Sequence, residues 1–418
     1  MSTLALLLLT ALSVQDPEPP SAREQAELAA RYLQRAPFDA LSRQDERELL
    51  ERLAAVPALS EREEERWRED LLELWSDGPE LETRSGSHWW QEEPERRGRY
   101  LIGGKTRRPR GLLIGMHGGG SGVGEASSAA AEWGSAAKEL GWVAVFPEVL
   151  VKTSRGWTTE GTEEYVLELI DAALRTFEVD PNRVYLAGHS MGGYGSWTLG
   201  GHHADRIAGI APSAGAPSQI LERGEVVDIE DGIVPNLGGV RVRVYQSDDD
   251  VQVPPAANRV AARRMAEAQE RWGGYDFEYW EVEGRGHDHP PGGLDDFLER
   301  LEGAERDPRP ESLRWQPALD WKRQYAWLHW ETPRYGTLVE ARLDREANRI
   351  EVTSTGEPAG LSVLVERELV DFERELVVSF AGREVFRGRP EARLEVLVET
   401  ARRGDPEAMY CARIPLAP

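Results

Sequence analysis

The feature that most constrains the fold is a short apolar strand that runs into the pattern Gly-x-Ser-x-Gly. The strand covers Val184–Ala187, and the pattern follows from Gly188 to Gly192 around Ser190. A helix over Tyr194–Leu199 is predicted directly behind it. A strand-to-helix turn this tight needs glycines on both sides, because side chains there would collide with the crossing backbone, and it holds the serine above the sheet edge. Ser190 is therefore a candidate nucleophile, and a chance match to the pattern is the alternative.

A serine hydroxyl is a weak nucleophile by itself, so this interpretation requires an oxyanion hole, an acid and a base elsewhere in the chain. Upstream, a buried strand predicted at Gly111–Met116 ends in a histidine and three glycines. Consecutive glycines let backbone amides turn toward an anion. We expect the oxyanion donors to be the amide of Met191 and one amide among Gly118, Gly119 and Gly120. A phosphate loop is the competing interpretation, but no Lys-Ser or Lys-Thr follows these glycines.

The acid is expected just after a strand that lies downstream of the serine. The alternating segment Val240–Tyr245 predicts this strand, and three adjacent aspartates follow it, Asp248, Asp249 and Asp250. A carboxylate presented at a strand end can orient a catalytic histidine. The residues alone leave the choice among the three open, and at least one of them is expected to be a solvated loop residue.

The general base is expected after the next predicted strand, Tyr275–Val282. His287 lies there between a glycine turn and a short acidic segment. His289 is the alternative, although Pro290 restricts its backbone. Thus oxyanion loop, serine, acid and histidine occur in the chain order that this type of site requires.

The remaining histidines do not suggest a metal site. His117 is expected to support the oxyanion loop, whereas His202 and His203 follow the helix behind the serine. A site built from these two with His287 and His289 can be imagined, but the chain has no H-E-x-x-H motif and a single cysteine. We therefore predict neither a metal nor an organic cofactor.

Around the serine the chain resembles a known group of hydrolases. The segment from Asp180 through Gly188–Trp197 to Pro212 is similar to the secreted hydrolases of the polyhydroxyalkanoate depolymerase and feruloyl esterase group, and equally to the prolyl-oligopeptidase-like predicted peptidases. The resemblance extends over roughly Leu112–Leu301. It implies an α/β-hydrolase fold, with a mostly parallel, doubly wound sheet, and a catalytic triad of serine, histidine and aspartate.

The resemblance also narrows the choice of acid. A Val-Pro pair three residues after the acid is usual in the related proteins, and Val253-Pro254 places it after Asp250, with Asp248 as the second choice. In one respect this chain departs from the pattern. Relatives often carry a His-Gly pair before the acid, where this chain has Gln246 and Ser247, so the details of the acid loop are expected to differ.

The N-terminal part predicts a leader followed by helices. Residues 1–15 are predicted to be a signal peptide, with an apolar run at Leu4–Leu12 that is too short to span a bilayer, which takes roughly 20 residues. A secreted or periplasmic protein without an integral membrane segment is therefore expected. Residues 16–85 have Leu and Ala at helical spacing and predict two or three amphipathic helices. The α/β-hydrolase domain is predicted at 86–305.

Residues 306–418 are predicted to form an antiparallel, β-sandwich-like accessory domain. The expected strands alternate or run apolar between turns; they are 338–343, 349–353, 361–365, 376–380 and 394–398. Four tryptophans accompany them, Trp315, Trp321, Trp327 and Trp330. If exposed, they would be a platform for carbohydrate, and if buried, they would be core residues.

The expected activity is two-step acyl transfer from a small or polymeric ester, with a peptidase or an acyltransferase as alternatives on the same triad. A non-catalytic binding protein is the alternative of a different class. The insertion at 214–239 is too short for a large lid, so an open cleft is expected, with Trp157 and Trp197 as wall residues. The formal net charge of −24 argues against nucleic acid and anionic membranes as partners.

Overall fold

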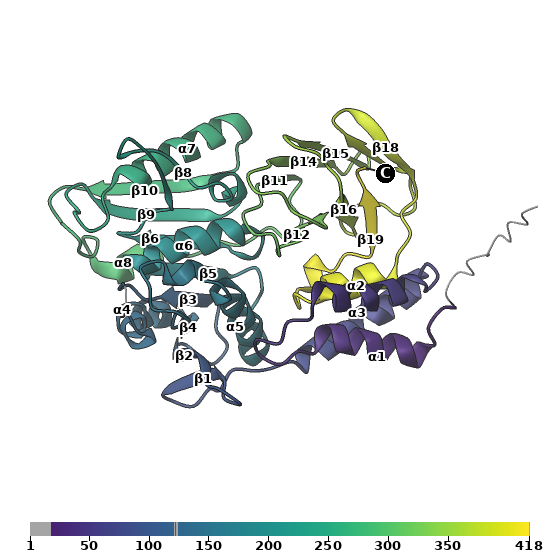
Figure 1. Cartoon of the computed structure of the whole chain (residues 1–418), viewed down its shortest axis with the longest axis horizontal. Helices are drawn as coiled ribbons and strands as arrows, with labels where there is room; N and C mark the ends of the chain where they lie inside the picture. The colour runs from purple at the N-terminus through teal and green to yellow at the C-terminus, as the bar shows by residue number, and fades with distance from the viewer. Residues whose placement is uncertain (1–17, 121, 123, 418) are drawn as a thin grey trace, which may run out of the picture.

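The computed structural model describes residues 18–120, 122 and 124–417, so the predicted signal peptide lies outside the described residues. Its centre is an eight-stranded sheet in the order β1-β2-β4-β3-β5-β6-β9-β10 (Figure 1). β2 pairs antiparallel with β1 and β4, and all other neighbours are parallel. The strands are β1 Ser87–Gln91, β2 Arg97–Gly104, β3 Leu112–Met116, β4 Val143–Pro147, β5 Val184–His189, β6 Gly209–Ser213, β9 Arg241–Ser247 and β10 Asp276–Val282. This strand order, with β4 placed between β2 and β3, is that of the α/β-hydrolase fold, which confirms the predicted fold class.

Helices cover both faces of this sheet. The helices are α4 Ala126–Glu139, α5 Thr162–Phe177, α6 Met191–His202, α7 Ala256–Trp272 and α8 Gly293–Glu299. One core lies on the α4 and α8 face and contains Trp133 and Phe297, and the other lies on the α5, α6 and α7 face. Because both faces are covered, every residue of β3, β4, β5 and β6 is buried. This explains why these strands read as continuous apolar runs.

The N-terminal part forms three helices, α1 Ala22–Leu33, α2 Arg43–Ala54 and α3 Glu61–Ser76. Each begins at a serine whose hydroxyl accepts a hydrogen bond from the first turn, and Ser60 and Glu63 form a full capping box. The helices are packed against the rest of the molecule. All three contact a C-terminal helix, α9 Leu394–Ala401 (Figure 1), and their buried leucines belong to the same core as α5.

The C-terminal part contains two sheets. The five-stranded sheet comprises β11 Ser312–Trp315, β14 Val339–Asp344, β15 Arg349–Ser354, β17 Leu376–Phe380 and β18 Arg383–Gly388. The four-stranded sheet comprises β12 Gln324–Tyr325, β13 Leu328–Trp330, β16 Leu361–Val365 and β19 Ala412–Pro415. Pairing is antiparallel except between β15 and β17. The strand predicted at 394–398 is wrong: this apolar run is α9, whose buried side packs on the N-terminal helices.

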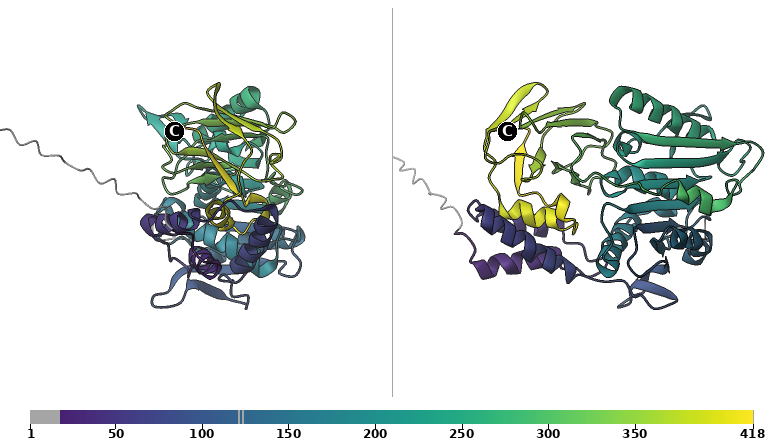
Figure 2. Two further views of the ribbon diagram at one scale, coloured as in Figure 1. Left: turned by 90° about the vertical axis from the view of Figure 1, so that its right-hand side faces the viewer. Right: turned by 180° about the vertical axis from the view of Figure 1, so that it is seen from behind.

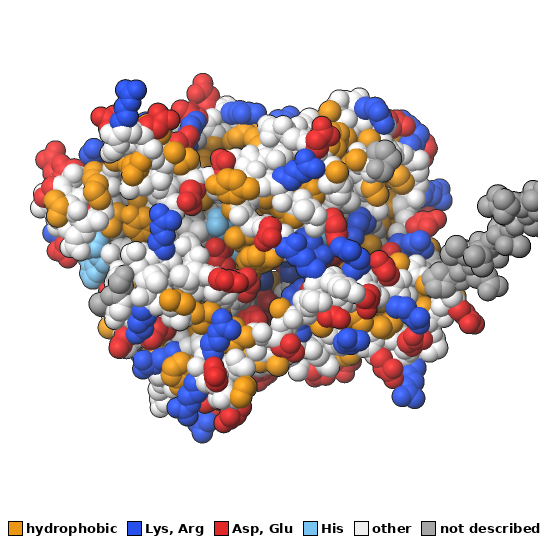
Figure 3. All heavy atoms as spheres, viewed as in Figure 1, with side chains coloured by type: hydrophobic (Ala, Val, Ile, Leu, Met, Phe, Trp, Pro, Cys, Tyr) orange, Lys and Arg blue, Asp and Glu red, His pale blue; other side chains and the backbone are white. Residues whose placement is uncertain are grey.

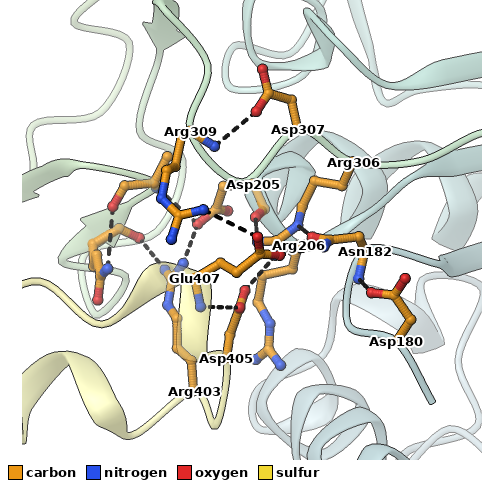
Figure 4. Close-up of polar contacts among 12 residues, drawn as sticks. Asp180, Asn182, Asp205, Arg206, Arg306, Asp307, Arg309, Arg403, Asp405 and Glu407 are labelled. Atoms are coloured by element: carbon orange, nitrogen blue, oxygen red, sulfur yellow. Dashed lines mark hydrogen bonds and ion pairs between the residues drawn. The ribbon is translucent and has the colours of Figure 1, made fainter. Parts of the chain in front are cut away.

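A buried network of charges joins the part that contains the central sheet to the C-terminal part (Figure 4). Asp205, in the turn after α6, is buried and pairs with Lys322 Nζ at 2.8 Å and with Arg403 at 2.6 Å. Nearby, Arg306 bonds to both Asn182 and Asp405. Burial alone would raise the pKa of the Asp205 carboxyl, but Arg403 and Lys322 hold it well below its usual range. The C-terminal sheets are therefore fixed to the central sheet by paired charges as well as by apolar packing.

The outside of the molecule is mixed in charge and elongated. Seen from behind, the C-terminal sheets stand beside the central sheet, and the N-terminal helices lie beneath the C-terminal sheets (Figure 2). On the face shown in Figure 3, acidic and basic side chains are interspersed with small apolar patches. Within the described residues, no helix is both long and apolar enough to cross a membrane.

Candidate active site

Ser190 occupies the sharp turn between β5 and α6. Its backbone has φ 56° and ψ −121°, which is strained for a residue with a side chain. The Ser190 amide donates to the Ser213 carbonyl at 2.8 Å and fixes the turn to β6. A Cβ on Gly188 would overlap the backbone of Gly192, and a Cβ on Gly192 would overlap the carbonyl of Met116. The two glycines of the motif are thus required by crossing backbones.

His287 lies between Ser190 and Asp250. Its Nε2 is 2.9 Å from Ser190 Oγ, and its Nδ1 is 2.7 Å from Asp250 Oδ2. The Asp250 side chain is completely buried, and its other oxygen accepts the backbone amides of Gln252 and Val253, each at 2.9 Å. A carboxylate in this position requires a proton on Nδ1, so Nε2 has its lone pair free to accept the serine proton.

The two other aspartates hold the loop that carries His287. Asp248 accepts the amide of Gly284 at 3.0 Å. Asp249 accepts the Ser247 hydroxyl at 2.6 Å and the amide of Gly286 at 2.7 Å, and these bonds lower its pKa. Both side chains are exposed and neither bonds to the histidine. The structure therefore brings Asp250, and not its neighbours, to His287.

A buried network behind the acid was not recognised in the sequence. Gln246 Nε2 donates to Asp250 Oδ2 at 3.2 Å, and Gln246 Oε1 accepts from Asn258 Nδ2 at 2.8 Å. The indole of Trp197 donates in turn to Asn258 Oδ1 at 3.2 Å. All these side chains are buried. Gln246 stands where related hydrolases often have the histidine of a His-Gly pair. This difference from the family pattern is the one signal in the sequence that points to the network.

The loop after β3 is shaped by His117. Its Nδ1 donates to the Gly118 carbonyl at 2.8 Å, and its Nε2 accepts the Val149 amide at 3.2 Å. Burial lowers the pKa of His117, so the ring is neutral and holds one tautomer. The loop is thereby fixed beside the serine: a Cβ on Gly118 would stand 3.4 Å from Ser190 Cβ.

The predicted oxyanion donors lie on either side of Ser190. Met191 is the first residue of α6, where backbone amides and the helix dipole favour an anion. Gly119 lines the same cavity as Ser190 and Met191, whereas Gly120 does not. Of the three glycines, Gly118 is therefore the one placed against Ser190 and Gly119 the one that lines its cavity.

The other histidines are engaged elsewhere. His189 is buried against the Ser213 hydroxyl at 3.1 Å, and desolvation, with the neighbouring His289 and His287, lowers its pKa to about 3. The His289 ring packs edge-on against His189 and makes no bond to Ser190.

His202 and His203 both bond to the buried carboxylate of Glu163, each at 3.0 Å. They do not join His287 in a common cluster. Across the described parts of the chain, no group of His, Cys, Asp or Glu side chains is arranged to hold a metal ion.

A cavity of about 350 Å³ opens beside Ser190. Trp157, predicted as a wall residue, lines it and donates its indole N–H to the His117 carbonyl at 3.1 Å. Trp197, a residue of α6, does not line it, because its ring is buried and its indole donates to Asn258 in the network behind the acid. The insertion at 214–239 forms a short hairpin, β7 Gln219–Glu222 and β8 Glu225–Ile229, whose base contributes Ser218 and Gln219 to the cavity.

Three of the four C-terminal tryptophans are core residues. Trp315, Trp327 and Trp330 are at most 1% exposed, and Trp315 packs in an edge-on contact with Trp330 at 6.1 Å between ring centres. Trp321 is half-buried and its ring lies 5.8 Å from that of His203. Their arrangement matches the packing interpretation rather than an exposed platform.

Comparisons with known proteins find limited similarity. No family model matches the chain. A bifunctional acetylxylan esterase/xylanase from Neocallimastix patriciarum is 34% identical over 85 residues, which cover 20% of this chain and 12% of that protein. The chain thus matches only about an eighth of this curated relative.

Among solved structures, a thermostable esterase is similar with a TM-score of 0.41 and 19% identity, over 53% of this chain and 63% of that one. A ferulic acid esterase from Anaeromyces mucronatus is similar with a TM-score of 0.39 and 16% identity, over 52% and 89% of the two chains. An acetyl xylan esterase from Aspergillus awamori is similar with a TM-score of 0.37 and 11% identity, over 49% and 93%.

Proposed function

We propose that this protein is a serine hydrolase that cleaves carboxylic esters through a covalent acyl-enzyme. One observation carries the proposal: an unbroken line of hydrogen bonds runs from buried Asp250 through His287 to Ser190, and Ser190 faces a cavity. A strained serine with an oriented imidazole at 2.9 Å meets the geometric requirement for an activated nucleophile.

In the first step Ser190 Oγ attacks the ester carbonyl and its proton passes to His287 Nε2. The carbonyl oxygen becomes an oxyanion, which the amide of Met191 and one amide from the loop at Gly118–Gly119 would stabilise. The Asp250 carboxylate stabilises the imidazolium that forms. Collapse of the intermediate breaks the ester bond, and His287 returns the proton to the departing alcohol.

In the second step the same groups hydrolyse the acyl-enzyme. Water gives a proton to His287 Nε2 and attacks the acyl carbon, and the second oxyanion occupies the same donors. When this intermediate collapses, the carboxylic acid leaves and Ser190 Oγ regains its proton.

Small acyl esters are the first substrates to test. The cavity beside Ser190 has room for a short acyl group, and polar side chains such as Ser154, Thr158 and Gln252 line it. The name of the similar acetylxylan esterase and the sequence resemblance to feruloyl esterases make acetyl and feruloyl esters of polysaccharides suitable candidates.

A fluorophosphonate probe tests the nucleophile directly. We expect the probe to label Ser190, and Ser190→Ala to abolish both labelling and hydrolysis of para-nitrophenyl acetate. The matched control is Ser218→Ala, because Ser218 lines the same cavity but, among the described residues, makes no hydrogen bond to a histidine as Ser190 does. This variant should still be labelled. Substantial ester hydrolysis by Ser190→Ala would refute the proposal, whereas activity on peptide but not ester substrates would favour the peptidase.

A further inference from the structure

The cavity beside Ser190 contains one charged side chain. Arg155 lines it from the loop before α5, while the other polar lining groups are neutral hydroxyls and amides. Arg155 is exposed, and no Asp or Glu oxygen of the described chain lies within 4.0 Å of its guanidinium. Lys152, three residues earlier, is by contrast paired with Glu148 at 3.0 Å.

The unpaired charge is notable because the protein is strongly acidic, with a formal net charge of −24. The functional carboxylate, Asp250, is buried, directs its oxygens to His287, Gln246 and two backbone amides, and is not among the groups that line the cavity. A guanidinium in a partly enclosed space is well suited to a carboxylate, which it can bind through two parallel hydrogen bonds.

We propose that the preferred substrates are esters that carry a carboxylate, and that Arg155 binds this carboxylate while Ser190 attacks the ester. This inference rests on the proposed ester hydrolysis. The carboxylate can belong to the acyl part, as in a half-ester of a dicarboxylic acid, or to the alcohol part, as in an acylated acidic sugar. Neutral donors and acceptors nearby, Ser154, Thr158, Ser218 and Gln219, suit the hydroxyl groups of such an alcohol.

Two pairs of matched esters distinguish these sources. For the acyl side, para-nitrophenyl hemiadipate is compared with para-nitrophenyl hexanoate. For the alcohol side, 4-acetoxybenzoate is compared with 4-acetoxybenzamide. The spontaneous hydrolysis of each ester is subtracted, and differences in intrinsic reactivity cancel when a variant and the wild type are compared on the same pair of esters. The wild type should favour the anionic member of at least one pair, and the favoured pair identifies the side of the ester that carries the charge.

Arg155→Gln should lower the ratio of anionic to neutral kcat/KM by about tenfold to 100-fold, the range expected for loss of one charge-assisted hydrogen bond. Arg155→Lys should retain part of the preference, because it keeps the charge but loses the paired geometry. Raising the salt concentration should reduce the wild-type ratio. The control is Arg263→Gln, which removes an exposed charge on α7 that does not line the cavity.

The outcomes separate this inference from the proposed function. If the wild type hydrolyses none of the four esters, ester hydrolysis itself is wrong. If it hydrolyses them but Arg155→Gln leaves both ratios unchanged, the role of Arg155 is wrong. An equal fall in Arg263→Gln would attribute the preference to the overall charge of the protein and would also overturn the site. Because Arg155 is exposed, its variants should unfold at the wild-type temperature, which is checked by circular dichroism.

Discussion

Replacing Asp250 by Asn tests the geometry of the proposed triad. Asp250 Oδ1 accepts two backbone amides and Oδ2 accepts from His287 and Gln246, so both oxygens face only donors. The asparagine carbonyl will stay on the two backbone amides, because turning it away would bring the side-chain NH₂ against both of them. The NH₂ group then faces His287 Nδ1. Because NH₂ can only donate, Nδ1 must give up its proton and accept the hydrogen bond.

His287 can satisfy this arrangement only in the other tautomer, with its proton on Nε2. That proton points at Ser190 Oγ at 2.9 Å, so the imidazole can no longer remove the serine proton. We expect kcat to fall about 10⁴-fold, which corresponds to about 5 kcal/mol of transition-state stabilisation. The assay is hydrolysis of para-nitrophenyl acetate, together with the rate of fluorophosphonate labelling.

Asp249→Asn is the matched control. Its side chain is exposed, and an asparagine carbonyl can still accept from the Ser247 hydroxyl and the Gly286 amide. We expect less than about a tenfold loss of activity, since the histidine loop keeps its anchors. A greater loss in Asp249→Asn than in Asp250→Asn would refute this assignment of the acid.

Three further outcomes are expected. In Gly192→Ala the new Cβ overlaps the Met116 carbonyl, so the variant should lose about 3 kcal/mol or more of its free energy of unfolding, measured in urea. The fluorophosphonate probe should no longer label Ser190. A variant as stable as the wild type would contradict this prediction. A chain that ends at residue 306 should be insoluble, or aggregated on size-exclusion chromatography, because buried Asp205 loses its partners Lys322 and Arg403. A soluble monomer that the probe labels would instead support a separable accessory domain. The pKa of His189 is about 3 in the folded state and about 6.5 when the chain is unfolded, so its contribution to stability is lost as the pH falls from 6.5 toward 3. The free energy of unfolding should therefore fall less between pH 7 and pH 5 in His189→Gln than in the wild type. An equal fall in both proteins would contradict this prediction.

The parts of the site that depend on local backbone were predictable from the sequence. Gly188 and Gly192 are needed wherever a strand turns directly into a helix around a serine, so the motif itself encodes the strained turn at Ser190. The choice among three aspartates was different. Side-chain directions within a turn depend on the bonds each residue finds, and here Asp248 and Asp249 bind the amides of the next loop while Asp250 turns inward.

Other features were set by contacts far away in the chain. The run at 394–398 is apolar throughout, so its period cannot separate a strand from a buried helix. It becomes a helix because α2 and α3 provide the surface that covers it. Trp197 could not be recognised as part of the acid network, because its partner Asn258 lies 61 residues away on α7. The sequence could equally not show that Trp315 and Trp330 face each other inside the C-terminal core.

The contact between the first three helices and α9 has a consequence for how the chain is made. About 320 residues separate Leu71 of α3 from Leu394 of α9. At roughly 5 to 20 residues per second, a ribosome needs roughly 15 to 60 s to synthesise the intervening residues. During this interval the apolar faces of α1, α2 and α3 have no α9 to cover them, so they are open to chaperones. The core around α1, α2 and α3 is therefore completed only after α9 has been synthesised, and a chain interrupted before α9 carries these amphipathic helices exposed.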